Sequence, residues 1–171
     1  MKKNIVFLFL KAIITFCIIC LNAFFFGCAT SPYGLGEISF YEKPKSINSE
    51  KYNLSIQALN YTYRYEQGWS QNTQVVTPVE GNIFMILYIE VYNNTDSTQD
   101  FDLGSIAVKD SLNNIVSPIS FFMKSIMPNT WAAPKITSIS SKDMNERALL
   151  YSVPKDFIPK KIISPLGEIS L

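Results

Sequence analysis

The chain contains no histidine among its 171 residues, and only 17% of them are charged. Histidine is the commonest general base, a frequent zinc ligand and the side chain that titrates near neutral pH, so its absence argues against all three roles. None of the seven glycines forms the G-x-G-x-x-G pattern of a phosphate-binding loop. We therefore expect a protein without catalytic activity and without a metal or organic cofactor.

An excess of basic residues is also lacking. Three of the 15 Lys and Arg residues precede Cys28 and none of the 14 Asp and Glu residues does, so the net charge from Cys28 onward is −2. Proteins that bind nucleic acid carry clusters of positive charge that neutralise phosphates. The charge balance therefore predicts no nucleic-acid partner.

The first 27 residues have the layout of a secretory signal peptide. Lys2, Lys3 and Lys11 precede an uncharged apolar run, residues 12–26. This run of 15 residues is short for a membrane span, because about 20 residues are needed to cross the hydrocarbon core. We therefore expect residues 1–27 to act as a leader for export.

Gly27 followed by Cys28 resembles the lipobox of bacterial lipoproteins. In that family the leader is cut before the cysteine, whose sulfur carries fatty acids. The resemblance implies that Cys28 is lipidated and holds the protein at a membrane of the bacterial cell envelope, outside the cytoplasm. Phe25 and Phe26 stand where the family has Leu and a small residue, so an uncleaved anchor and ordinary cleavage stay open as alternatives.

The residues that follow the leader predict a tether and one domain. Residues 28–36 include Ser, Pro and two Gly, which is typical of a flexible linker. Cys17 and Cys20 lie in the leader, so a cleaved chain keeps only Cys28 and forms no internal disulfide. The domain expected over residues 37–171 must therefore depend on its hydrophobic core.

Alternation of apolar and polar residues predicts an all-β domain. In residues 82–92 one face is purely aliphatic, whereas the other is mixed and ends polar, which suits a sheet with one face on the core and one partly wet. Frequent turn residues and nine prolines oppose long helices. We expect an antiparallel, immunoglobulin-like β-sandwich. The other expected strands are residues 37–41, 52–65, 101–108, 115–116, 136–139, 147–153, 161–163 and 168–170.

Three segments resemble one known family. Residues 81–94, 101–111 and 147–156 are similar to strands and turns of the telokin-like, immunoglobulin-fold domain found on bacterial lipoproteins and secreted antigens. The resemblance covers residues 52–171 and implies the sandwich fold. It implies no catalytic activity, because the family has none in general and many of its members have no assigned role.

Tyrosines are concentrated in residues 61–69, which read YTYRYEQGW. Tyr61, Tyr63 and Tyr65 recur with period two, so they would share one face of a strand. This face has the opposite parity from Tyr52 and Asn60, unless a bulge near Asn60 resets the register. Together with Trp69 they form a candidate contact surface for sugar rings or a partner protein. The alternative is that these tyrosines cover the sheet.

Residues 118–134 form a second candidate contact surface. The segment is long for a sandwich connection and is apolar, so we expect a loop that is either folded back as a lid on the core or exposed as a contact surface. Its candidate contact residues are Phe121, Phe122, Met123 and Trp131.

These observations favour a lipid-anchored, exported module that binds an envelope protein or a glycan without catalysis. A purely structural envelope lipoprotein and a cryptic enzyme are alternatives. A weak calcium site is a third, since Asp96, Asp100 and Asp102 lie close together in sequence. Without the Asp-x-Asp-x-Asp-Gly order of a calcium loop, however, this segment favours a solvated hairpin turn.

Lipidation is tested by the substitution Cys28→Ala. We expect the variant to leave the detergent phase and to keep its leader, because two acyl chains supply stable anchoring and the cysteine directs cleavage. Phase partitioning and intact mass measure both effects. A variant that stays membrane-bound at unchanged mass would establish the uncleaved anchor instead.

Overall fold

The computed structural model describes residues 37–67, 74–124, 129–130 and 132–171. All of these residues belong to the unit Pro32–Leu171. The predicted leader and tether, with Cys28, lie outside the described residues, as do Trp69 and Trp131. Among the residues that are described, no helix is long and apolar enough to span a membrane.

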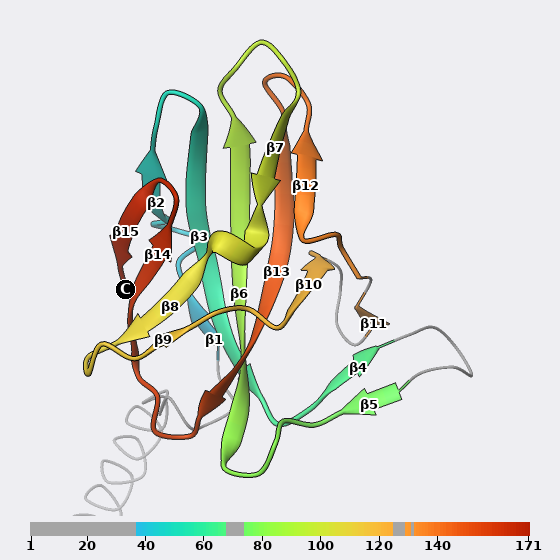
Figure 1. Cartoon of the computed structure of the whole chain (residues 1–171), viewed down its shortest axis with the longest axis vertical. Coiled ribbons are helices and arrows are strands. Elements are labelled where there is room, and N and C mark those ends of the chain that lie inside the picture. The colour runs from blue at the N-terminus through green and yellow to red at the C-terminus, as the bar shows by residue number, and fades with distance from the viewer. Residues whose placement is uncertain (1–36, 68–73, 125–128, 131) are drawn as a thin grey trace, which may run out of the picture. The chain divides into compact units, whose positions relative to one another are not determined.

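The main sheet has six strands and is built around three long antiparallel ones (Figure 1). Its order is β1-β3-β6-β13-β10, and β2 pairs with a further part of β3. The strands are β1 (Glu37–Ser39), β2 (Lys45–Asn48), β3 (Tyr52–Thr62), β6 (Asn82–Asn93), β10 (Ser120–Met123) and β13 (Met144–Pro154).

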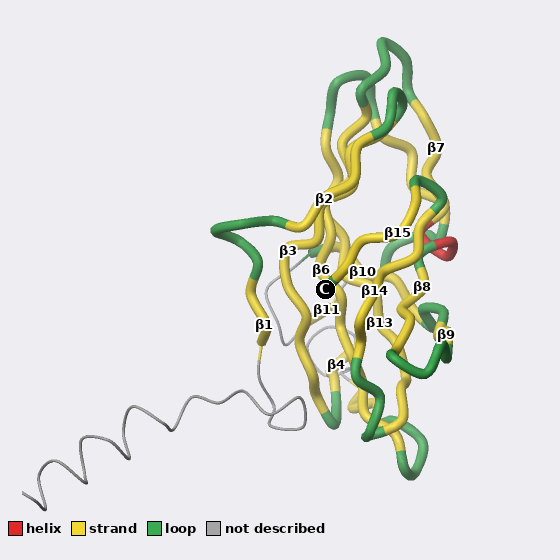
Figure 2. The backbone as a smooth tube through the Cα atoms, turned by 90° about the vertical axis from the view of Figure 1, so that its left-hand side faces the viewer, coloured by secondary structure: helices red, strands yellow, loops and turns green. Residues whose placement is uncertain are grey.

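A second layer covers one face of the main sheet. It contains a four-stranded sheet of order β15-β14-β8-β9 and the antiparallel pair β7 and β12. In Figure 2, β8 and β9 lie on the opposite side of the molecule from β1 and β3. The strands are β7 (Gln99–Asp102), β8 (Ala107–Asp110), β9 (Ile115–Val116), β12 (Ile136–Ile139), β14 (Pro159–Ser164) and β15 (Gly167–Ser170). The predicted antiparallel β-sandwich is thereby confirmed.

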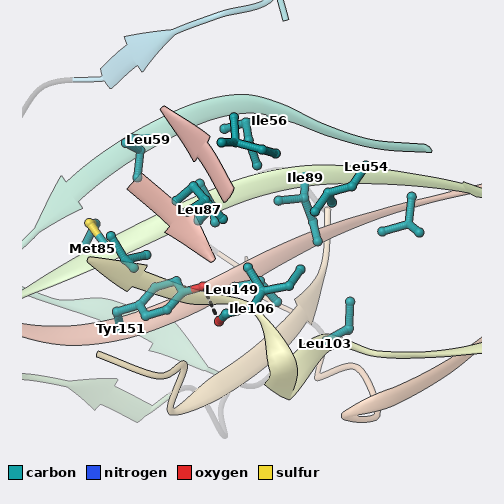
Figure 3. Close-up of a cluster of buried hydrophobic side chains, with 14 of the residues drawn as sticks. Leu54, Ile56, Leu59, Met85, Leu87, Ile89, Leu103, Ile106, Leu149 and Tyr151 are labelled. Atoms are coloured by element: carbon teal, nitrogen blue, oxygen red, sulfur yellow. Dashed lines mark hydrogen bonds between the residues drawn. The ribbon is translucent and has the colours of Figure 1, made fainter. Parts of the chain in front are cut away.

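The core between the layers is mainly aliphatic (Figure 3). Tyr151 on β13 is fully buried there, and its hydroxyl donates a hydrogen bond of 3.1 Å to the carbonyl oxygen of Ile106 in the second layer. Burial raises the pKa of Tyr151 far above its ordinary value. The predicted aliphatic face of β6 is confirmed, because every member lies in this core. Its members are Ile83, Met85, Leu87, Ile89 and Val91.

A third, small sheet reaches the opposite face of the main sheet, which we term the outer face. It consists of β11 (Asn129–Thr130), β4 (Tyr65–Gln67) and β5 (Gln74–Val76) in that order. The ring of Tyr65 packs edge-on against Phe84 at 5.3 Å and Phe122 at 5.6 Å between centroids. These aromatic contacts fasten the β4–β5 hairpin to the outer face.

A β-bulge decides which face of the main sheet Tyr61 occupies. The pairing of β3 with β6 shifts between Ile56 and Ala58, which inserts Gln57 as an extra residue. After the shift, Tyr61 lies on the same core-facing side as Leu54 and Ile56. A bulge therefore does reset the register of this strand, three positions before Asn60.

Three predicted segments differ from the structure. The strand expected over residues 52–65 ends at Thr62, and a separate strand, β4, begins at Tyr65. The strand expected over residues 101–108 is interrupted by a 3₁₀ helix, η2 (Leu103–Ser105), because the Asp102 carboxylate accepts the N–H of Gly104 at 2.8 Å. Residues 118–134 were expected to be a loop, but Phe121 and Phe122 lie in β10 and pair with β13. Pairing with β13, rather than local alternation of apolar and polar residues, makes β10 a strand at the edge of the main sheet.

Asn93 joins the hairpins at one end of the sandwich. Its side chain is fully buried, and its Nδ2 group donates to the carbonyl oxygens of Ser97, Ile139 and Ser140 at 2.7, 3.0 and 3.1 Å. Its Oδ1 atom accepts the N–H of Thr95 at 2.9 Å. One side chain thus satisfies backbone groups of both the β6–β7 and the β12–β13 connections.

The substitution Asn93→Ala should therefore lower the free energy of unfolding by about 3 kcal/mol, since several buried backbone groups lose their partner. Urea denaturation followed by circular dichroism measures the change. Thr98→Ala, at an exposed position of the same loop, is the matched control and should change stability by less than about 0.5 kcal/mol. Equal stability of the two variants would refute this role of Asn93.

Candidate functional site

The outer face of β6 changes character along the strand. Phe84 and Ile86 are buried beneath the β4–β5 hairpin, whereas Tyr88, Glu90 and Tyr92 are only partly buried. The prediction that this face is mixed and ends polar is confirmed. The polar half is the candidate site, which we term the outer-face site. It comprises Tyr41, Asn53, Ser55, Tyr88, Glu90, Tyr92, Lys124 and Glu146.

Two carboxyl groups occupy the centre of the outer-face site. Glu90 on β6 and Glu146 on β13 are direct cross-strand partners, so their carboxyl groups lie side by side on one face of the sheet. Lys124, just after β10, donates to Glu146 Oε1, and its Nζ atom lies 5.3 Å from the ring centroid of Tyr41. The site is therefore a carboxyl pair, one cation and an aromatic ring that covers the cation.

The environment changes the pKa of two of these groups. Burial raises the pKa of Glu90, and the hydrogen bond and negative charge of Glu146 raise it further. Burial alone would lower the pKa of Lys124, but its contact with Glu146 outweighs this effect and the pKa is raised. Glu146 and Lys124 therefore form the ion pair, while Glu90 keeps its proton to higher pH than an ordinary glutamate.

Two residues of β3 border the carboxyl pair of the outer-face site. Ser55 on β3 is opposite Glu90, and Asn53 is opposite Tyr92, so both border the carboxyl pair. Within the described residues, the Oδ1 atom of Asn53 accepts no hydrogen bond and is shielded from solvent. A ligand that contacts the Glu146 carboxylate must supply hydrogen-bond donors.

The predicted tyrosine surface does not form. Tyr61 is buried in the core between the layers, whereas Tyr65 is buried on the outer face beneath its own hairpin. Tyr63, between them, is exposed. The expectation that the three rings share one face is wrong, because β3 ends at Thr62 and Tyr65 belongs to a separate strand, β4.

The second predicted surface is also divided. Phe121 is half-buried against the core between the layers, Phe122 is buried on the outer face, and Met123 is exposed. Alternation along β10 sends neighbouring side chains to opposite faces, so these residues form no single contact surface. Cys28, Trp69 and Trp131, the remaining predicted site residues, lie outside the described residues.

Sequence reasoning missed the charged centre of the outer-face site. The sequence did contain a signal for Glu90, which is a charged residue within an otherwise largely apolar strand. Tyr88 and Tyr92 lie two positions before and after it. Glu146 and Lys124 come from segments distant in sequence. Only the register of β6, β13 and β10 brings them to Glu90.

The three aspartates considered for calcium have separate partners. Asp96 forms an ion pair with Lys142 at 3.1 Å, and Asp100 accepts a hydrogen bond from the Ser138 hydroxyl at 2.6 Å. Asp102 caps η2. In the part of the chain that is described, no group of three or more Asp, Glu or Cys residues is arranged to hold a metal ion.

Comparisons with known proteins support the fold. No protein-family model matches the chain, and no curated protein matches it. A solved structure described as a conserved hypothetical protein from Bacillus anthracis is similar at a TM-score of 0.55 and 14% identity, over 80% of this chain and 96% of that one. An uncharacterized β-sandwich protein from Clostridium difficile 630 is similar at a TM-score of 0.50 and 10% identity, over 72% and 86%. At these identities the likeness shows the β-sandwich fold alone.

The substitution Glu90→Gln should make folding stability less dependent on pH. Since the pKa of Glu90 is raised in the folded protein, the stabilisation by its proton is complete below the ordinary glutamate pKa and is lost as the pH rises through the folded value. The free energy of unfolding of the variant, minus that of the unchanged protein, should therefore be larger at about pH 7 than at about pH 4. Urea unfolding at both values measures the difference.

Glu168→Gln is the control of opposite sign. Lys161, at 2.6 Å, lowers the pKa of Glu168, so its stabilisation is present above the ordinary glutamate pKa and is lost as the pH falls. This variant should be relatively less stable at the higher pH. The same direction of change in both variants would contradict the assignment at Glu90.

Proposed function

We propose that the protein is an exported lipoprotein of the bacterial cell envelope whose β-sandwich, of the telokin-like immunoglobulin type, binds a saccharide on the outer-face site. The leader pattern and Cys28 support export and anchoring. The segments that resemble the telokin-like domain support the finer assignment of the sandwich. Binding by contact without catalysis is the activity that the outer-face site favours.

The observation that carries the proposal is the carboxyl pair on two central strands. Like charges directly opposite each other destabilise a sheet, and partial burial of a carboxylate costs further free energy. The lower part of the same face is instead apolar and covered by the β4–β5 hairpin. A costly polar arrangement on the uncovered part is typical of a binding site rather than of a structural surface.

The chemistry of the outer-face site matches a saccharide. Sugar hydroxyl groups are donors for the partly exposed carboxyl groups of Glu90 and Glu146. Tyrosine rings offer apolar faces for the C–H surface of a sugar ring, with a hydroxyl at the edge for a hydrogen bond. Tyr88 and Tyr92 flank the carboxyl pair on the same strand, so one extended saccharide can reach rings and carboxyl groups together.

The ion pair at the site favours binding over cleavage. Glycoside hydrolysis needs one free carboxylate, as nucleophile or base, beside a carboxylic acid. Lys124 donates to Glu146 and forms an ion pair with it, so this carboxylate is directed at a cation rather than at a substrate.

Isothermal titration of the mature lipidated chain in detergent with N-acetylglucosamine and glucose oligosaccharides tests the proposal. We expect binding to one of these series, and a loss of about tenfold in affinity for Tyr92→Ala and for Glu146→Gln, as one lost stacking or charged hydrogen-bond contact predicts. Leu112→Ser, in the exposed β8–β9 turn, is the control and should bind normally.

Two results would overturn the saccharide assignment. One is the absence of binding to every oligosaccharide, as a purely structural envelope lipoprotein predicts. The other is binding of a lysine-rich peptide, rather than a sugar, with an affinity that falls steeply as salt is added. That result would identify a cationic protein partner.

A further inference from the structure

The two ends of the long strands differ in chemistry. At the end where β6 finishes, three connections carry no hydrophobic residue: residues 49–51, 94–98 and 140–143. These connections lie together at the top of Figure 1. We term this the polar end of the sandwich.

At the opposite end, where β6 begins, hydrophobic side chains are exposed. Tyr63, Val79 and Ile158 expose 42%, 69% and 42% of their surface. Lys155 holds this region together, since its N–H donates to the carbonyl oxygen of Gly81 at 3.1 Å and its Nζ atom lies 5.9 Å from the ring centroid of Tyr63. We term this the apolar end.

The tether joins the domain near the apolar end. β1 begins at Glu37, which pairs with Asn60, two residues before the end of β3. The predicted tether, residues 28–36, can reach about 30 Å when fully extended. The twelve residues of β6 span about 40 Å. The tether therefore joins the domain closer to the apolar end than to the polar end, and it is long enough for the apolar end to rest on the bilayer.

We infer that the apolar end rests on the lipid bilayer and inserts Tyr63, Val79 and Ile158 into its interface. The inference rests on the proposed lipid anchor at Cys28. Tyrosine and aliphatic side chains are suited to the boundary between lipid headgroups and acyl chains. The neighbouring charges cancel, so the contact depends on apolar burial and does not require anionic lipid. They are Arg64 and Lys155 against Glu80 and Asp156.

This contact fixes the direction in which the domain points. The long strands rise from the bilayer, and the polar end faces the aqueous phase. Glu90 lies eight residues along β6 from Asn82, which places the outer-face site about 25 Å from the apolar end. A saccharide therefore approaches the site from the side, clear of the lipid headgroups.

Position-specific quenching in the full lipidated chain tests the inference. Val79→Cys, Ile158→Cys and Asp96→Cys each introduce a thiol for an environment-sensitive fluorophore, and Asp96 lies at the polar end. The mature chain has no competing thiol, because Cys17 and Cys20 leave with the leader and Cys28 is acylated. The probe is a neutral phosphatidylcholine vesicle that contains headgroup spin-labelled lipid.

We expect quenching to be at least about fivefold stronger at positions 79 and 158 than at position 96, since spin-label quenching requires close contact with the headgroups. The contrast should persist at high salt, because the contact is apolar. Equal quenching at all three positions, or stronger quenching at position 96, would overturn the inference.

A matched pair of substitutions separates the apolar contact from the tether. In the chain labelled at position 158, Val79→Ser should reduce quenching several-fold, whereas Met144→Ser should not. Met144 is 44% exposed and pairs with Tyr92 near the polar end. No effect of Val79→Ser would show that the tether alone sets the position, which also overturns the inference.

Failure of the lipid anchor gives a different result. If the labelled chain does not float with the vesicles, the proposed lipoprotein is itself wrong and the inference falls with it. If the chain floats but shows no dependence of quenching on position, the anchor stands and the proposed orientation alone is overturned.

Discussion

Burial of the aliphatic face of β6 between the two layers is the interaction on which the rest of the structure depends. Its inward side chains, from Ile83 to Val91, are almost fully buried. At about 2 kcal/mol for each, their burial is comparable to the net stability of a whole domain. A slip of one residue would move Glu90 into this core and expose the aliphatic face. The core therefore fixes which side chains reach the outer face.

Short-range patterns predicted the parts of the fold that short-range physics determines. Alternation along one strand is a local property, so the two faces of β6 and the bounds of β9 and β12 could be predicted from the sequence. The register between strands is not local. Glu146 is 56 positions after Glu90, and only the packing of β6 against β13 makes them partners. For the same reason β10 was expected to be a loop, because only its pairing with β13 makes this segment a strand.

The tyrosine segment shows how one extra residue changes a surface. Without the bulge at Gln57, regular alternation from Leu54 and Ile56 would place Tyr61 on the outer face. With the bulge, Tyr61 enters the core, whereas Tyr65, in the next strand, packs on the outer face. The hairpin that Tyr65 fastens packs over Phe84 and Ile86, and the partly buried Tyr88 packs against this cluster. Tyr65 thus limits the extent of the outer-face site, although the sequence predicted that Tyr65 would belong to a separate contact surface.

The proposed site and the proposed orientation place one constraint on the ligand. Strands that rise from a bilayer hold the outer face perpendicular to it, and the carboxyl pair lies beyond the half of that face occupied by the β4–β5 hairpin. Tyr88, Glu90 and Tyr92 follow one another along this direction, so a saccharide in contact with all three runs away from the membrane. A glycan that lies parallel to the membrane would instead cross β3, β6 and β13 and meet Ser55, Glu90 and Glu146. The first arrangement uses both tyrosine rings, and the second uses both carboxyl groups. The loss of affinity on removing the rings, compared with the loss on removing the carboxyl groups, therefore indicates in which direction the glycan lies on the domain.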